Sequence, residues 1–106
     1  MDTYLVVRHQ IGDFEQWKKV FDESDDLRRR YGIGHGWILR DIEDPHRVTV
    51  MLSYQSQERA RQFMALDSLK DMMRRGGVKG EPIVTFVEQA AEVAELTPTT
   101  DAWPFC

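Results

Sequence analysis

Residues 13–31 read DFEQWKKVFDESDDLRRRY, and the rest of the chain is expected to fold around this stretch. Apolar side chains recur along it at helical spacing, which predicts one long amphipathic helix. Asp13 with Gln16 three residues later fits a capping box, and Gly32 is a suitable C-terminal stop. The apolar stripe is interrupted once, by Ser24, and consists of Phe14, Trp17, Val20, Phe21, Leu27 and Tyr31. So much aromatic surface on one side of a helix requires a broad apolar partner.

That partner is expected to be a β-sheet, because four other stretches have the composition and alternation of strands. Residues 47–54 (RVTVMLSY) alternate most clearly between an apolar face and a mixed face, and Met51 falls on the mixed one. Ser56 can cap a second helix that starts at residue 57, and helical turns resume at Asp67. The four strands are expected at residues 3–9, 36–41, 47–54 and 83–88.

The resulting order is β-α-β-β-α-β, which predicts an α+β, ferredoxin-like fold when both crossovers are right-handed. In this fold a four-stranded antiparallel sheet carries both helices on one face. The other sheet face is left uncovered and is too apolar for water, so we expect a homodimer that buries it. We expect one domain over residues 1–91 and a tail over residues 92–106, whose Trp103 and Phe105 could reach the other subunit.

Composition narrows the function classes. The 106 residues suit a single domain with a small core, and a net charge of −4 argues against binding to nucleic acid. The single cysteine, Cys106, excludes an internal disulfide, and no Cys/His spacing suggests zinc. No secretory signal or membrane-length apolar run is recognisable, so we expect a cytoplasmic protein without membrane contact. Arg28, Arg29 and Arg30 are expected to form a solvated last helical turn, where cations suit the helix dipole.

Six segments carry a likeness to known proteins: YLVVRHQ, DFEQWKKVFD, GIGHGWILRDIEDP, VTVMLSY, RARQFMALDSLKDMMRRGGVKGEP and IVTF. Over approximately residues 3–90 the chain resembles the dimeric α/β-barrel superfamily, especially its antibiotic-biosynthesis-monooxygenase-like and polyketide-cyclase-like members. The resemblance implies a ligand held between the helices and the sheet of one subunit. The superfamily includes cofactor-free oxygenases, cyclases, isomerases, haem-degrading enzymes and proteins with no known activity, so fold alone does not assign chemistry. The haem-degrading branch carries an asparagine on its first strand, and residues 3–9 have none, which argues against haem.

Two histidines are candidates for proton transfer. His9 shares a strand face with Leu5 and Val7, so its imidazole enters an apolar site if that face meets the helices. The alternative is a strand-end histidine at the solvent edge or hydrogen-bonded to the backbone. His35 lies between two glycines, which allow a ligand to approach closely but also form an ordinary flexible loop. His46 is expected to face solvent from a turn, and the spacing of the three histidines predicts no metal site.

Aromatic, methionine and hydroxyl side chains could form the walls of a ligand pocket. Aromatic walls suit flat polycyclic molecules, and methionines, including Met72 and Met73, give an adaptable lining. Each has a structural alternative: aromatic rings and methionines fill small cores, and Ser24 can bond back to the carbonyl four residues earlier. The candidate ligand-binding residues are Trp17, Phe21, Ser24, Met51, Phe63 and Met64.

Three functions stay open. The first is a cofactor-independent monooxygenase or cyclase acting on aromatic, polyketide-like compounds, with His9 or His35 moving the proton. The second is a ligand-binding or stress-response protein with the same pocket and no turnover. The third is a structural dimer in which the pocket is only core. We expect no cofactor and no metal, and the expected partners are a second copy of the chain and a small aromatic molecule.

Overall fold

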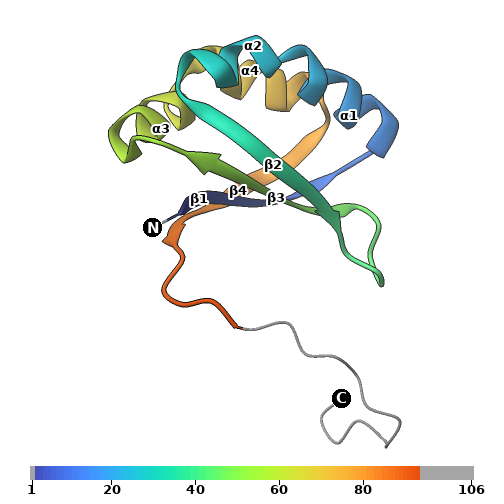
Figure 1. Cartoon of the computed structure of the whole chain (residues 1–106). Helices are drawn as coiled ribbons and strands as arrows, with labels where there is room; N and C mark the ends of the chain where they lie inside the picture. Colours follow the sequence, from blue (N-terminus) through green and yellow to red (C-terminus); the bar gives the residue numbers. More distant parts are fainter. Residues whose placement is uncertain (1, 94–106) are drawn as a thin grey trace, which may run out of the picture.

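The computed structural model describes residues 2–93, whose helices and strands follow the order β-α-β-β-α-β with each helical part divided in two (Figure 1). The elements are β1 (Thr3–Ile11), α1 (Phe14–Glu23), α2 (Asp25–Arg30), β2 (Ile33–Arg40), β3 (Arg47–Tyr54), α3 (Gln57–Met64), α4 (Asp67–Arg75) and β4 (Val78–Glu88). The predicted α+β, ferredoxin-like fold is confirmed. The expectations for Trp103 and Phe105 lie outside the described residues. None of the helices within residues 2–93 has the length and apolar character needed to cross a membrane.

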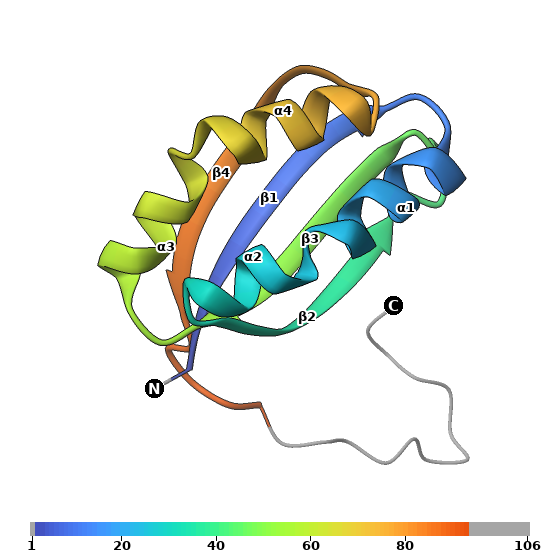
Figure 2. The ribbon, with the colours of Figure 1, turned by 90° about the horizontal axis from the view of Figure 1, so that it is seen from above.

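The sheet has the strand order β2-β3-β1-β4, and all neighbouring strands are antiparallel. The long strand β1 lies inside the sheet, where Val7 is opposite Val50 of β3 and Val84 of β4. Helices α1 and α2 lie over the β2–β3 side of the sheet, and α3 and α4 lie over the β1–β4 side, all on one face (Figure 2). Side chains from β1 and β3 therefore meet both pairs of helices.

Strand alternation divides the side chains between a covered and an uncovered face. The uncovered face keeps large apolar groups in contact with solvent: Trp37, Leu39 and Ile83 are 40%, 53% and 66% exposed. Figure 1 shows that none of the helices within residues 2–93 lies beneath this face. The buried core on the covered face includes Leu5, Val7, Ile11, Trp17, Val48, Val50, Leu52, Phe63 and Leu69.

The long helix expected over residues 13–31 is interrupted at Ser24, so the prediction of one continuous helix is wrong. The Ser24 hydroxyl donates to the carbonyl of Phe21 at 2.8 Å, and this local bond competes with regular helical hydrogen bonding. The predicted ends are confirmed. The carboxylate of Asp13 accepts a hydrogen bond from the Gln16 backbone N–H at 3.0 Å, and Gly32 has a φ of 71° directly after the C-cap.

Two strands begin earlier than the sequence pattern predicts. β2 begins at Ile33 rather than at residue 36, and β4 begins at Val78 rather than at residue 83. The register between β1 and β4 shifts near Gly80, which has a φ of 70°, so β4 is irregular there. Pro82 is tolerated inside the strand because β4 is an edge of the sheet.

Candidate functional site

A cavity of about 60 Å³ lies between the helices and the covered face of the sheet. Of the eight residues predicted from sequence to form a site, six line it: His9, Trp17, Phe21, Ser24, Phe63 and Met64. The wall is completed by Val7, Val20, Arg28, Val50, Leu52, Leu69, Met72, Met73 and Gly76. Most of these side chains are apolar, and three polar side chains, those of His9, Ser24 and Arg28, share the wall.

The first polar group is the imidazole of His9, on the covered face of β1. It is only 7% exposed, and neither ring nitrogen has a hydrogen-bond partner among the described residues. Burial lowers the pKa of His9 from its usual value of 6.5, because the charged form loses hydration. His9 is therefore a neutral imidazole at neutral pH, with one nitrogen able to donate and the other able to accept.

A row of neighbouring rings runs from His9 along the cavity wall and ends at a guanidinium. The ring of His9 lies 5.5 Å from that of Trp17, and Trp17 stacks on Phe21 with centroids 5.2 Å apart. The guanidinium of Arg28 lies 3.8 Å from the centre of the Phe21 ring, in cation–π geometry. Helix α1 thus presents two aromatic faces between a neutral base at one end and a cation at the other.

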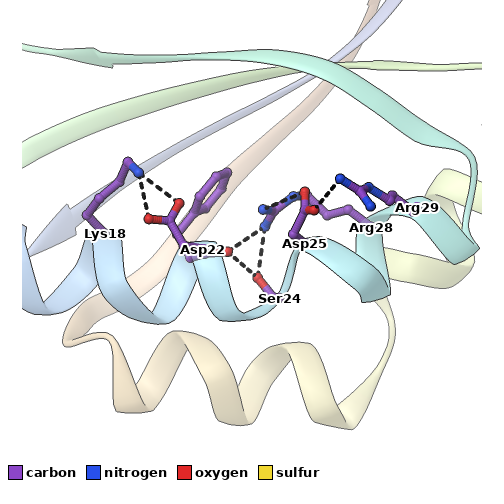
Figure 3. A network of polar contacts seen from close by, with 7 residues as sticks. Lys18, Asp22, Ser24, Asp25, Arg28 and Arg29 are labelled. Carbon is purple, nitrogen blue, oxygen red and sulfur yellow. Dashed lines mark hydrogen bonds and ion pairs between the residues drawn. The ribbon is translucent and has the colours of Figure 1, made fainter.

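The expectation that Arg28 is solvated is wrong: this side chain is buried, with 7% exposed, whereas Arg29 is exposed. Its Nη1 donates to the Phe21 carbonyl at 2.9 Å and to the Ser24 hydroxyl at 2.8 Å (Figure 3). Burial lowers the pKa of Arg28 from its usual value, with Asp25 and Asp22 acting in the opposite direction. Arginine stays protonated in proteins, so a positive charge remains in the wall.

The hydroxyl of Ser24 is hydrogen-bonded to Arg28 rather than left available for a ligand. Its hydroxyl donates to the Phe21 carbonyl three residues back, not to the carbonyl four residues back that the sequence suggested. The same oxygen accepts from Arg28. Both functions of the hydroxyl are therefore occupied, and Ser24 fixes the position of the guanidinium.

The structure does not bring Met51 and His35 into this cavity. Met51 is paired with Val6 and Trp37, one position out of phase with Val50 and Leu52, so its side chain belongs to the uncovered sheet face. The ring of His35 packs edge-on against Trp37, with centroids 4.6 Å apart, and both line a separate open pocket of about 590 Å³.

The remaining histidine, His46, is exposed as expected, and its Nδ1 lies 2.8 Å from the Gly12 carbonyl. Across residues 2–93, no three His, Cys, Asp or Glu side chains are grouped in the way that a metal site requires.

Sequence reasoning missed Arg28, although a signal for its burial was present. Arg28 lies four residues after Ser24 and seven after Phe21, which places all three on one side of a helix. A run of three arginines looks uniformly solvated when only its charge is considered. The helical position of each residue distinguishes Arg28 from Arg29 and Arg30, which are exposed.

No protein-family model matches the sequence, and no curated protein matches it significantly. Solved structures do match. A Bordetella bronchiseptica protein assigned to the antibiotic biosynthesis monooxygenases gives a TM-score of 0.71 at 12% identity, covering 85% of this chain and 98% of that one. A variant of SnoaB, a cofactor-independent oxygenase from Streptomyces nogalater, gives 0.68 at 13% identity, covering 89% and 98%.

A third structure is the monooxygenase from ActVA-Orf6 of Streptomyces coelicolor, solved in complex with nanaomycin D. It gives a TM-score of 0.62 at 12% identity and covers 89% of this chain and 92% of that one. At such identities the likeness concerns the fold. The chain has the ferredoxin-like fold of the antibiotic biosynthesis monooxygenases, as the sequence resemblance predicted.

Proposed function

We propose that the cavity binds a small aromatic molecule and that the protein acts on it as a cofactor-independent monooxygenase or cyclase, with His9 as the base. The observation that carries this proposal is a buried imidazole with no hydrogen-bond partner among the described residues. An unsatisfied buried polar group costs free energy, so its retention is explained if a ligand supplies the missing partner. Shared fold with SnoaB and ActVA-Orf6 adds support for this class of chemistry.

The proposed chemistry begins with proton transfer. Neutral His9 accepts the proton of a phenol or an enol, which leaves an electron-rich anion in a water-poor cavity. Such an anion can react with dioxygen or close a ring. Trp17, Phe21 and Phe63 hold the rings of the substrate in this scheme, and His35 has no role in it because it lies on the other side of the sheet.

Binding requires the cavity to widen. Its volume of about 60 Å³ is well below the ~300–1,000 Å³ of typical small-molecule pockets. Met64, Met72 and Met73 line it from the α3–α4 side, and unbranched thioether side chains change conformation easily. We expect these methionines to move aside when a polycyclic ligand enters.

A second copy of the chain is the proposed partner for the uncovered sheet face. Large apolar side chains on this face, including Trp37 and Leu39, stay accessible in one subunit. Pairing two copies face to face removes this surface from water, and a single interface covers the apolar face of both subunits.

The enzymatic proposal is tested by incubating the protein with anthrone or with a tetracenomycin-type phenol and following the absorption spectrum. We expect oxidation or cyclisation that is reduced at least tenfold by His9→Gln and unaffected by His35→Gln, the matched control on the other sheet face. Equal turnover in both variants, or no turnover by the wild type, would contradict the proposed mechanism.

A binding protein without turnover is the second candidate. It is favoured by one observation: among the described residues no carboxylate orients His9, whereas catalytic histidines usually have such a partner. In this case aromatic ligands raise the melting temperature but stay chemically unchanged. If no member of a broad aromatic panel shifts the melting temperature, the purely structural dimer is the better description.

A further inference from the structure

The wall of the cavity carries a net positive charge, which a neutral ligand would leave unbalanced. Arg28 contributes a buried positive charge to the wall, and the described residues that line the cavity include no Asp or Glu. We infer that the ligand carries an anionic oxygen, as an aromatic carboxylate or a phenolate, which pairs with Arg28. This inference rests on the proposed binding function and specifies the class of molecule that is bound.

The counter-ion of Arg28 within the protein is weak. The Asp25 carboxylate lies 3.7 Å from Nη2 of Arg28, beyond hydrogen-bonding distance, and is half-exposed. The same carboxylate lies 2.8 Å from Arg29, so its closer partner is the exposed arginine. A buried cation without a close anion is costly, and an anionic ligand would supply the missing charge.

The guanidinium is also held ready to bind. Within residues 2–93 its hydrogen bonds come from Nη1 alone, to the Phe21 carbonyl and the Ser24 hydroxyl (Figure 3). Its central carbon lies over the Phe21 ring. Nε and Nη2 therefore retain donors for a ligand, on a group whose plane is already fixed, so little side-chain entropy is lost on binding.

Arg28 also stands where the cavity meets the surface. Phe21, Arg28 and Leu52 line both the inner cavity and a groove of about 280 Å³ that opens beside β2, next to Gly34 and Gly36. A ligand that enters here would place its ring against Trp17 and its charged end at Arg28.

Two carboxylates, those of Asp22 and Asp25, also line this groove, but each is paired with a cation, which weakens its repulsion of an anion. Asp22 contacts Lys18 at 2.7 Å, and Asp25 contacts Arg29 at 2.8 Å (Figure 3). The unbalanced charge at this point is therefore that of Arg28. Because opposite charges attract more strongly away from water, this buried cation should select anionic ligands over neutral ligands of the same shape.

The test compares the acid 2-naphthoate with the neutral amide 2-naphthamide, which has the same rings, by isothermal titration calorimetry. Arg28→Gln removes the charge but keeps a donor for the Phe21 carbonyl, and Arg28→Lys keeps the charge. Arg30→Gln is the control, since it removes a neighbouring exposed charge that lines neither the cavity nor the groove and leaves the Arg29–Asp25 pair in place. The fold of each variant is checked by circular dichroism.

We expect the wild type and Arg30→Gln to bind the acid about 10- to 100-fold more tightly than the amide, as for a charge-assisted hydrogen bond. Arg28→Gln should bind both ligands within about threefold, while Arg28→Lys keeps part of the preference. A 4-nitrophenol titration tests the phenolate: wild type should lower the pKa of the bound phenol, read from its visible absorbance, and Arg28→Gln should not.

The possible outcomes distinguish the role of Arg28 from the binding of aromatic ligands in general. Equal affinity of the wild type for acid and amide, or an unchanged preference in Arg28→Gln, would overturn the role of Arg28 and leave aromatic binding intact. If the wild type binds neither compound at millimolar concentration, aromatic binding itself is contradicted. Should Arg28→Gln fail to fold, the acid–amide ratio of the wild type and of Arg28→Lys still decides.

Discussion

At the scale of single residues, His9 illustrates how a fold can retain a costly group. Its ring belongs to strand β1 and packs against Trp17, and neither ring nitrogen has a hydrogen-bond partner among the described residues. Arg28 has a similar character, because its charge is buried while its nearest carboxylate is half-exposed. Residues of this kind are often functional, since stability alone would favour apolar replacements.

Replacing His9 by leucine tests this cost directly. Without ligand, we expect His9→Leu to increase the free energy of unfolding by about 1–3 kcal/mol at about pH 8, because two unsatisfied polar atoms are removed. The change is measured by urea unfolding followed by circular dichroism. His35→Gln, on the other side of the sheet, is the control. A destabilised His9→Leu protein would indicate that the imidazole makes favourable interactions in the native state.

The pH dependence of stability gives a second test of His9. Its native pKa lies below the 6.5 of the unfolded chain, so the unfolded state binds more protons below that pH. Titration of His9 therefore does not reduce the free energy of unfolding above about pH 6.5. Below that pH the free energy of unfolding decreases as the pH falls through the native pKa. In urea unfolding between about pH 8 and 5, His9→Leu should gain stability relative to wild type as the solution becomes more acidic. A constant difference would contradict this.

At the scale of elements, the break between α1 and α2 shapes the site. The hydroxyl of Ser24 ends regular α1 geometry and also accepts a hydrogen bond from Arg28. One side chain, that of Ser24, thus both interrupts the helix and holds the buried cation in place. Helix α1 brings Trp17 and Phe21 to the cavity, so the start of α1 also matters for the site.

The N-cap of α1 can be tested with two substitutions at one position. Asp13→Ala removes the oxygen that accepts from the Gln16 backbone and should lower the free energy of unfolding by about 1 kcal/mol. Asp13→Asn keeps a capping oxygen and should change stability by no more than a few tenths of that amount. Chemical denaturation gives both values, and equal losses in the two variants would argue against capping as the cause.

Strand β2 offers a matched pair of glycines. A Cβ on Gly36 would overlap the Leu52 side chain and crowd the Met51 carbonyl, whereas one on Gly34 would meet only the Ser53 hydroxyl at 3.5 Å. Gly36→Ala should therefore destabilise by about 1–3 kcal/mol through overpacking. Gly34→Ala should be nearly neutral. Thermal unfolding measures both, and similar melting temperatures would show that Leu52 adjusts freely.

At the scale of the whole molecule, one sheet separates two different environments. The covered face carries the core and the cavity, and the uncovered face carries exposed apolar side chains such as Leu39 and Ile83. Met51 and His35 lie on the uncovered side, so they would belong to a subunit interface rather than to a ligand site.

The proposed dimer is tested by size-exclusion chromatography with light scattering. We expect the mass of two chains for the wild type at micromolar concentration. Leu39→Glu, which adds a charge to the uncovered face, should give the mass of one chain, because burying an unpaired carboxylate is costly. Ile42→Glu is the control, since Ile42 is 99% exposed in the turn after β2. A wild-type protein that elutes as a folded monomer would contradict the dimer.

Local sequence patterns determined many structural features of this protein. The order of helices and strands, the cap at Asp13, the stop at Gly32 and the face of β1 that carries His9 all follow from periodicity and from backbone preferences near each residue. The face of Met51 could also have been recognised, because strict alternation already placed it on the mixed side of its strand. These features depend on a few neighbouring residues, so one sequence is enough to predict them.

The amino-acid sequence alone therefore determined the ferredoxin-like fold and identified six of the fifteen residues that line the cavity. Only the tertiary structure decided that Arg28 is buried while Arg29 is not, that His9 lacks a partner among the described residues, and that the cavity is small. The physical reason is that burial and hydrogen bonding depend on elements distant in sequence. Whether a charge keeps its water is set by what packs over it, and no local pattern contains that information.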